Sequence, residues 1–205
     1  MKPLEKLIVS SMYVASISDR EPFEIIKEKG GITQEAIDSK IEECIKNDLL
    51  KEDRKTLTEF GRSSLKVVLA GGVFDIIHPG HIHTLKAAKD LGDVLIVVIA
   101  TDNTAEKMKK RRPLHDQDQR KMLVDSLSVV DLGVVGHEGD IFKTVDIIKP
   151  QIIALGYDQV HQEKFITEGC KKINLDVQVA RLQSPIPEVS SSIIEKKYGE
   201  NIHDI

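Results

Sequence analysis

The sequence has no tryptophan, and only 4% of its 205 residues are aromatic. It has two cysteines, Cys44 and Cys170, which lie far apart and form no CxxC pair. This spacing argues against a zinc site or a disulfide scaffold and favours two buried thiols in a reducing compartment. No apolar run approaches the roughly 18 residues that a membrane span needs. Near the N-terminus Glu5 comes early and no clear cleavage site follows, so we expect a cytoplasmic protein without a membrane partner.

An excess of basic charge is also missing. The formal net charge is −4 and the isoelectric point is about 6.0. Proteins whose main task is to bind a nucleic-acid backbone carry a concentrated positive charge, so we do not expect nucleic acid as a partner. The hydrophobic content of 40% is ordinary for a globular protein, and the length allows one large domain or two small ones.

From Lys66 onward, apolar runs alternate with helical patterns. The runs are KVVLA, VLIVVIA, LGVVG, QIIALG and VQVARL, and the helical patterns cover about residues 80–91, 117–128, 141–148, 160–172 and 190–198. Continuous β-branched runs separated by helices are typical of a parallel sheet that is buried on both faces. Residues 66–205 are therefore predicted to form a doubly wound, Rossmann-like α/β domain, which binds ligands beyond the carboxyl ends of its strands.

Residues 1–62 lack this alternation. Helical patterns cover about residues 3–16, 21–29 and 34–47, and the segment KEDRKTLTEFGR follows them. The pattern resembles a winged helix-turn-helix module, with KEDRKTLTEFGR as the wing and its exit. The boundary to the α/β domain is predicted at Ser63–Ser64.

The third of these helices does not suit DNA. A helix that reads a groove needs cationic or amide side chains in a basic surround. Here acidic residues outnumber the basic ones: Glu35, Asp38, Glu42 and Glu43 against Lys40 and Lys46. We expect residues 1–62 to be an accessory domain for packing, dimerisation or substrate covering.

The segment GGVFDIIHPGH, residues 71–81, directly follows the first predicted strand and opens a helix. Gly71 and Gly72 let the backbone turn sharply and approach a ligand closely. Pro79 suits the first turn of a helix, and Gly80 leaves the helix N-terminus open to an anion such as phosphate. His78 and His81 are three residues apart, so both imidazoles can face the same phosphate. His83 points elsewhere and is interpreted as structural.

This segment resembles the signature of the HxGH cytidylyltransferase-like nucleotidyltransferases, a superfamily that includes glycerol-phosphate cytidylyltransferases and archaeal FAD synthases. The resemblance covers residues 66–205 and none of residues 1–62. It implies that His78 and His81 stabilise the charge that builds up on the α-phosphate. It further implies nucleotide binding by the glycine-rich segment, that is by Gly71, Gly72, Val73, Phe74, Asp75 and Gly80.

A basic segment follows the second predicted strand, in ATDNTAEKMKKRRPLHDQDQRKML. The family pattern places a lysine-bearing loop here and an arginine at the start of the next helix, which match Lys107, Lys109, Lys110 and Arg120. Cations at a strand end can hold the negative charge of a triphosphate. Lys110 and Arg120 are expected to be catalytic and Lys107 to bind nucleotide, although the sequence leaves open which lysine contacts phosphate.

Two further segments match the family in order. ALGYDQ resembles the corresponding segment of archaeal FAD synthases, where Gly156 would allow close approach of the nucleotide and Asp158 would bind it or cap a helix. VSSSIIEKK matches the family's ISTT-type segment, so Ser190, Ser191 and Ser192 would hold the β- and γ-phosphates or cap a helix. The arginine that cytidylyltransferases carry just before this segment is replaced by SPIPE.

The implied reaction is attack by a substrate phosphate on the α-phosphorus of a nucleoside triphosphate, with release of pyrophosphate. Mg²⁺ or another divalent cation is expected to arrive with the nucleotide, and no protein-made metal site is expected. ALGYDQ and the missing arginine favour FAD synthase, which joins ATP and FMN, although few aromatic residues are present to stack on a flavin. The alternatives are a CTP-dependent transferase acting on glycerol 3-phosphate or a similar head group, and a nucleotide-sensing transcriptional regulator. The family resemblance suggests a homodimer.

Overall fold

The computed structural model describes residues 1–156 and 159–183, and the chain divides into two compact units, Met1–Lys66 and a second unit that begins at Val67. Each unit is described by itself. Within the described residues, no helix is long and apolar enough to cross a membrane.

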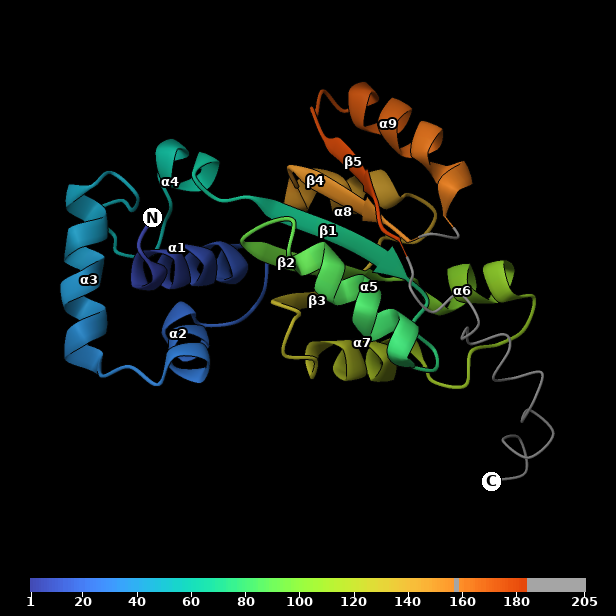
Figure 1. Cartoon of the computed structure of the whole chain (residues 1–205), viewed down its shortest axis with the longest axis horizontal. Helices are drawn as coiled ribbons and strands as arrows, with labels where there is room; N and C mark the ends of the chain where they lie inside the picture. Colours follow the sequence, from blue (N-terminus) through green and yellow to red (C-terminus); the bar gives the residue numbers. More distant parts are fainter. Residues whose placement is uncertain (157–158, 184–205) are drawn as a thin grey trace. The chain divides into compact units, whose positions relative to one another are not determined.

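The first unit is helical (Figure 1). It contains α1 (Pro3–Ser16), α2 (Pro22–Gly30), α3 (Gln34–Lys46) and the short α4 (Glu59–Ser63). Thr33 and Thr58 cap the N-termini of α3 and α4 by accepting backbone N–H hydrogen bonds. Helix α1 contacts the other three helices. The side chains that fill the core of this unit are fully buried aliphatic groups, namely Ile8, Val9, Ile25, Ile26, Ile37 and Ile41.

The segment between α3 and α4 is a turn that returns on itself. Its two arms are joined by a single antiparallel bridge between Leu50 and Leu57. The Asp53 carboxylate holds the turn by accepting hydrogen bonds from the backbone N–H groups of Lys55 and Thr56, at 3.0 and 2.8 Å. The segment predicted to be a wing is therefore a bridged turn and not a two-stranded ribbon. The winged-helix assignment stays a prediction.

The second unit contains one five-stranded sheet in which all strands are parallel. The α/β fold predicted from the alternating pattern is confirmed. The strands are β1 (Val67–Gly72), β2 (Val94–Ile99), β3 (Leu132–Val135), β4 (Ile152–Leu155) and β5 (Gln178–Arg181). The helices are α5 (Pro79–Lys89), α6 (Asp102–Lys109), α7 (Gln117–Asp125), α8 (Ile141–Ile148) and α9 (Glu163–Lys172), with a short η1 (Val160–Gln162).

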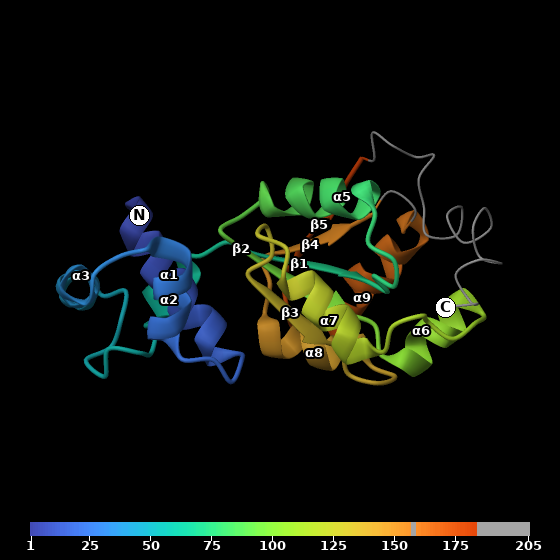
Figure 2. The same cartoon turned by 90° about the horizontal axis from the view of Figure 1, so that it is seen from below.

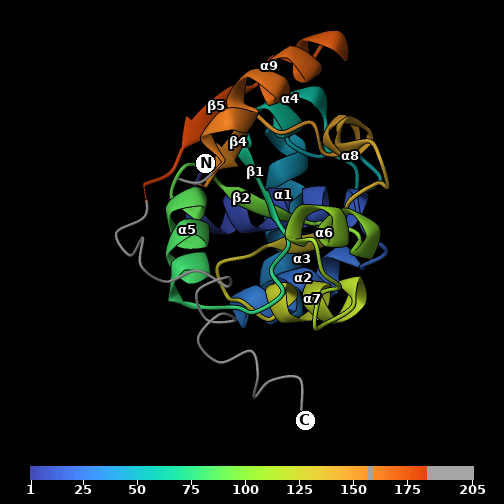
Figure 3. The same cartoon turned by 90° about the vertical axis from the view of Figure 1, so that its right-hand side faces the viewer.

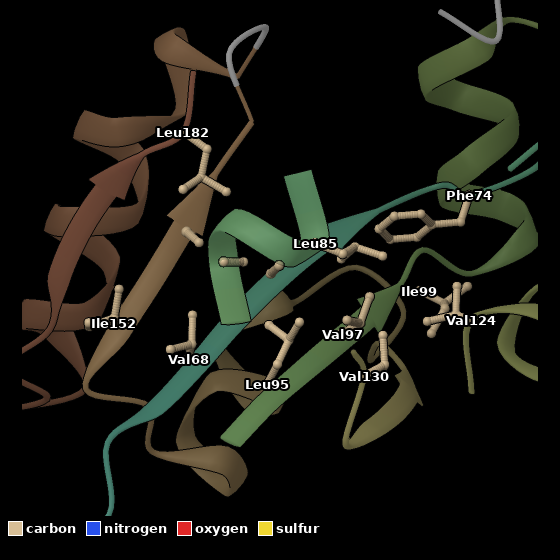
Figure 4. Packing of buried hydrophobic residues seen from close by; sticks show 13 residues of the cluster. Val68, Phe74, Leu85, Leu95, Val97, Ile99, Val124, Val130, Ile152 and Leu182 are labelled. Atoms are coloured by element: carbon tan, nitrogen blue, oxygen red, sulfur yellow. The ribbon is translucent and has the colours of Figure 1, made fainter. Parts of the chain in front are cut away.

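Helices cover both faces of this sheet. Figures 2 and 3 show α5 on one side of the strands and α8 on the other. The α5 face packs a continuous cluster, in which Leu85 of α5 meets Val68 and Val97 of the central strands (Figure 4). Burial of such side chains is worth roughly 1.5–3 kcal/mol each. The sheet is thus a rigid base for whatever lies at its carboxyl edge.

The strand order is β3-β2-β1-β4-β5. The chain runs outward from β1 through β2 to β3 and then crosses back to place β4 on the other side of β1. A crevice therefore opens at the carboxyl ends of β1 and β4, where the order reverses. Figure 3 views this edge, with α6 nearest to the reader. The segment 71–81 leaves the sheet at this point.

One helix was not expected. The sequence predicts a lysine-bearing loop after β2, but residues 102–109 form the helix α6, capped by Thr101, whose hydroxyl accepts a hydrogen bond from the Thr104 N–H. The helix ends at Lys110, which has the left-handed φ of 57°. The predicted helix at about 190–198 lies outside the described residues.

Candidate active site

The two histidines of the HxGH motif lie side by side. His78 is the N-cap residue of α5, and Pro79 begins the helix as predicted. The ring centroids of His78 and His81 are 3.9 Å apart with an angle of 30° between the ring planes. Both Nδ1 atoms are buried and have no hydrogen-bond partner among the described residues. Because buried polar atoms are nearly always paired, this pair is suited to a ligand that supplies the missing partner.

The helix N-terminus adds one backbone donor to this pair. Pro79 has no N–H, and the His81 N–H already bonds to the carbonyl of His78 at 2.9 Å. The amide of the buried Gly80 has no such partner within the part of the chain that the structure describes. The predicted anion site therefore consists of one amide, the positive end of the helix dipole and two imidazoles.

Burial favours the neutral form of both imidazoles. It lowers the pKa of His81 to about 4; protonation of His78 and the positive charge of Lys109 act in the same direction, and a hydrogen bond with the Ile76 backbone opposes them. Burial and the charge of Lys109 also lower the pKa of His78. A bound anion would favour the protonated forms, so the site is poised to gain positive charge when a phosphate arrives.

The sharp turn of the motif was predicted at Gly71 and Gly72 but lies at Phe74. Gly71 and Gly72 are the last two residues of β1 and remain in the strand. The unusual backbone is at Phe74, whose φ is 54°. A Cβ on Gly72 would lie 3.0 Å from the Phe74 ring, so glycine is needed there to seat that ring. The ring also contacts His81, with 5.2 Å between centroids, so this turn helps to fix the imidazole.

Asp75 faces the protein and not the crevice. Its carboxylate is buried, pairs with Arg111 at 2.9 Å and accepts the His115 N–H at 3.1 Å. Backbone hydrogen bonds from His115 and Leu114, together with Arg111, outweigh burial and lower the pKa of this carboxyl. Its negative charge holds the segment after α6 against the motif. We therefore interpret Asp75, predicted to bind nucleotide, as a positioning residue.

Arg120 is also turned into the protein. The sequence predicts a catalytic cation, but the side chain is 0% exposed. Its guanidinium donates to the carbonyls of Val73 and Ala100, both at 2.8 Å, and of His115 at 3.0 Å, and it pairs with Asp102 at 2.7 Å. With all its nitrogens engaged, Arg120 joins the segments that follow β1 and β2 and does not present charge to a ligand. Helix α7 carries it inward, which periodicity alone does not reveal.

The lysines after β2 divide into two groups. Lys107 and Lys110 are exposed and lie with Asn103 and Glu106 around an open surface hollow. Lys109 is partly buried, and its charge acts on both histidines. Of the three lysines whose roles the sequence left open, Lys109 is therefore the one that we propose to act beside the imidazole pair.

The segment after β4 reaches the end of β1. The Gly156 N–H donates to Oε1 of Gln159 at 2.9 Å, and the Gln159 amide donates to the Gly71 carbonyl at 3.3 Å. Gln159 was not singled out from the sequence. Asp158, Ser190, Ser191 and Ser192 lie outside the described residues. Val73 and Phe74 are buried behind the motif, where they support its backbone.

These features define a class of protein. A parallel α/β sheet carries, at its switch point, an imidazole pair, an open helix N-terminus and a lysine whose charge acts on both rings. This combination is that of a nucleotidyltransferase, which stabilises charge on a phosphate without a nucleophilic side chain.

Comparison with known proteins identifies the family. Residues 69–197 match the cytidylyltransferase-like family, so the chain belongs to it. The FAD synthase of Aciduliprofundum boonei is 46% identical over 134 residues, covering 65% of this chain and 80% of that protein. The FAD synthase of Thermoplasma volcanium is 46% identical over 136 residues, covering 66% of this chain and 95% of that protein.

A solved structure agrees with this placement. It is described as a lipopolysaccharide core biosynthesis protein from Thermoplasma volcanium and is 45% identical to this chain. The match covers 59% of this chain and 98% of that one, with a TM-score of 0.56.

Proposed function

We propose that this protein is an FAD synthase, which transfers AMP from ATP to FMN and releases pyrophosphate. The observation that carries the proposal is the adjacent pair of His78 and His81, whose buried Nδ1 atoms lack partners among the described residues. The relatives named FAD synthase supply the identity of the substrates.

In this reaction an oxygen of the FMN phosphate attacks the α-phosphorus of ATP. A new P–O bond forms, the bond from the α-phosphorus to the oxygen bridging to the β-phosphate breaks, and its electron pair leaves on pyrophosphate. His78 and His81 hydrogen-bond the α-phosphate oxygens as charge builds up, and Lys109 adds positive charge beside them. Such stabilisation typically contributes about 10²–10³-fold per donor to the rate.

Nucleotidyltransferases of this kind generally use a divalent cation with the nucleoside triphosphate. Among the described residues, no group of three or more His, Cys, Asp or Glu side chains is placed to hold a metal ion. The proposal includes Mg²⁺ or another divalent cation that arrives with ATP and would supply positive charge against the leaving pyrophosphate.

A pyrophosphate-release assay tests the proposal. ATP and CTP, each with Mg²⁺, are combined in turn with FMN, glycerol 3-phosphate, phosphoethanolamine and pantetheine phosphate. Pyrophosphate release is expected only in the combination of ATP with FMN. Release with CTP and a head-group phosphate, and none with FMN, would contradict the FAD synthase assignment while retaining the transferase class. The homodimer suggested by the family belongs to the same proposal, and light scattering tests it.

A further inference from the structure

A cavity of about 160 Å³ is lined by the carboxyl ends of the central strands and by residues of α8. Its walls are mostly aliphatic. They include Leu69, Val98 and Ile153 from the strands, Ile141 and Val145 from α8, and Ile166 from α9. A largely apolar cavity of this kind suits the apolar part of a ligand and not a phosphate.

The cavity adjoins the proposed catalytic segment. Gly71 and Gly72 form part of its lining, and the chain continues from them into the turn that carries the histidines. Gln159 lies in the same wall and bonds to the Gly71 carbonyl. A ligand whose ring occupies the cavity can therefore extend its phosphate toward the helix α5 N-terminus.

Five polar side chains interrupt the aliphatic lining: Thr101, Thr104, His137, Gln159 and Gln162. Thr101 and Thr104 bond to each other. Gln159 bonds to the backbone at Gly71 and Gly156. This leaves two polar groups for a ligand, His137 and Gln162.

His137 follows β3 and is exposed, so it marks the open side of the cavity. Its Nδ1 lies 3.0 Å from the buried hydroxyl of Thr144, which also accepts the His137 N–H at 2.9 Å. A hydroxyl can donate to Nδ1 while it accepts the backbone N–H. In that arrangement the ring proton is on Nε2, which can donate to a ligand.

Gln162 is the second polar group. It ends η1 and lines the cavity half-buried, and its side-chain amide forms no hydrogen bond with the described residues. An amide of this kind can donate to a ring carbonyl and accept from a ring N–H at the same time.

We propose that this cavity receives the isoalloxazine ring of the acceptor, with His137 and Gln162 recognising its polar edge. The proposal rests on the FAD synthase assignment. Isoalloxazine has an apolar dimethylbenzene end and an opposite edge of two carbonyls and an N–H. Adenine instead has nitrogen acceptors around its periphery, and several would be buried unpaired among aliphatic walls. The aliphatic lining also explains how a chain with few aromatic residues can hold a flavin.

The experiment measures binding of FMN, by quenching of its fluorescence, and of a non-hydrolysable ATP analogue, by calorimetry. Val145→Phe narrows the cavity, and Ile147→Phe, on the exposed side of the same helix, is its control. His137→Phe removes the Nε2–H donor, and His161→Phe, at an exposed site outside the cavity, is its control. Gln162→Leu tests the amide, and the melting temperature of each variant is measured.

The Kd for FMN is expected to rise at least about tenfold in Val145→Phe, because the ring and the added phenyl compete for one space. Rises of about fivefold are expected in His137→Phe and Gln162→Leu. Binding of the ATP analogue should stay unchanged, and the controls should match the wild type. If Val145→Phe does not fold, FMN binding by His137→Phe and Gln162→Leu tests the proposal.

Two results would overturn the proposal while leaving the FAD synthase assignment intact. One is weaker binding of the ATP analogue with unchanged FMN binding, which would assign the cavity to adenine. The other is unchanged binding of both ligands in all the cavity variants. Failure of the wild-type protein to bind FMN would instead contradict the FAD synthase assignment itself.

Discussion

The two units place their multiply paired arginines differently. In the first unit Arg54 pairs at the surface with Asp38 and Glu42, at 2.7 and 2.8 Å. In the second unit charged groups are taken into the interior at the carboxyl edge of the sheet, where Asp75 and Arg120 are almost fully buried. Burying a charged side chain costs free energy unless all its hydrogen-bond partners are in place. The buried charges at this edge therefore fix the positions of the segments that they join, and do not serve stability alone.

The largest expected effect is a difference in unfolding free energy between substitutions of Arg120 and of Arg54. Arg120→Met should lower the free energy of unfolding by about 3–5 kcal/mol, because three carbonyls and Asp102 lose their buried partner. Arg54→Met should cost at most about 1 kcal/mol, since the Arg54 side chain is 39% exposed and its pairs are screened by water. Urea unfolding of both variants measures the difference.

Arg20→Met serves as a second surface control, because Arg20 pairs with Glu28 in an equally exposed setting. Equal losses in the Arg120 and Arg54 variants would remove the contrast between the two units.

The next effect concerns pH. Since burial lowers the pKa of His81 to about 4, the unfolded chain binds a proton that the native protein does not bind between pH about 6.5 and about 4. Stability is therefore lost as the pH falls through this window. Between pH 7.5 and 4.5 the wild type should lose about 2–3 kcal/mol more than His81→Asn. Urea unfolding at the two pH values gives this difference directly, and parallel losses would argue against a buried neutral imidazole.

The smallest expected effect is binding of the first unit to polyanions. The acidic residues of α3 leave no basic face for a phosphate backbone, and Arg54 folds back onto two of them. The full chain should therefore pass through heparin at low salt without retention. Retention that is lost when Lys27 and Lys29 of α2 are changed to Ala would show a nucleic-acid surface on this unit and revive the regulator hypothesis.

The sequence predicted most of the fold because the strands are continuous apolar runs. All five parallel strands lie where those runs predict them. Helix α6 was missed, because its residues DNTAEKMK carry few apolar side chains and read as a basic loop. The helical pattern of these residues is weak, so apolar periodicity alone does not predict the helix that they form in the folded protein.

For the candidate site, the HxGH spacing was enough to predict that His78 and His81 lie together. Spacing does not show which way a charged side chain points. Arg120 and Asp75 carry charge in a motif region, yet the fold turns both inward. The cavity with His137 and Gln162 joins segments from β1 to α9, and no local pattern links residues so far apart in the chain.

The most direct test of the account follows the label from ATP carrying ³²P at the α-phosphate in a single turnover with FMN. The account predicts that label appears in FAD with the wild-type protein and with His83→Ala. With His81→Ala it predicts a rate lower by about 10²–10³-fold. Undiminished transfer in His81→Ala, or no transfer to FMN in the wild type, would contradict the account.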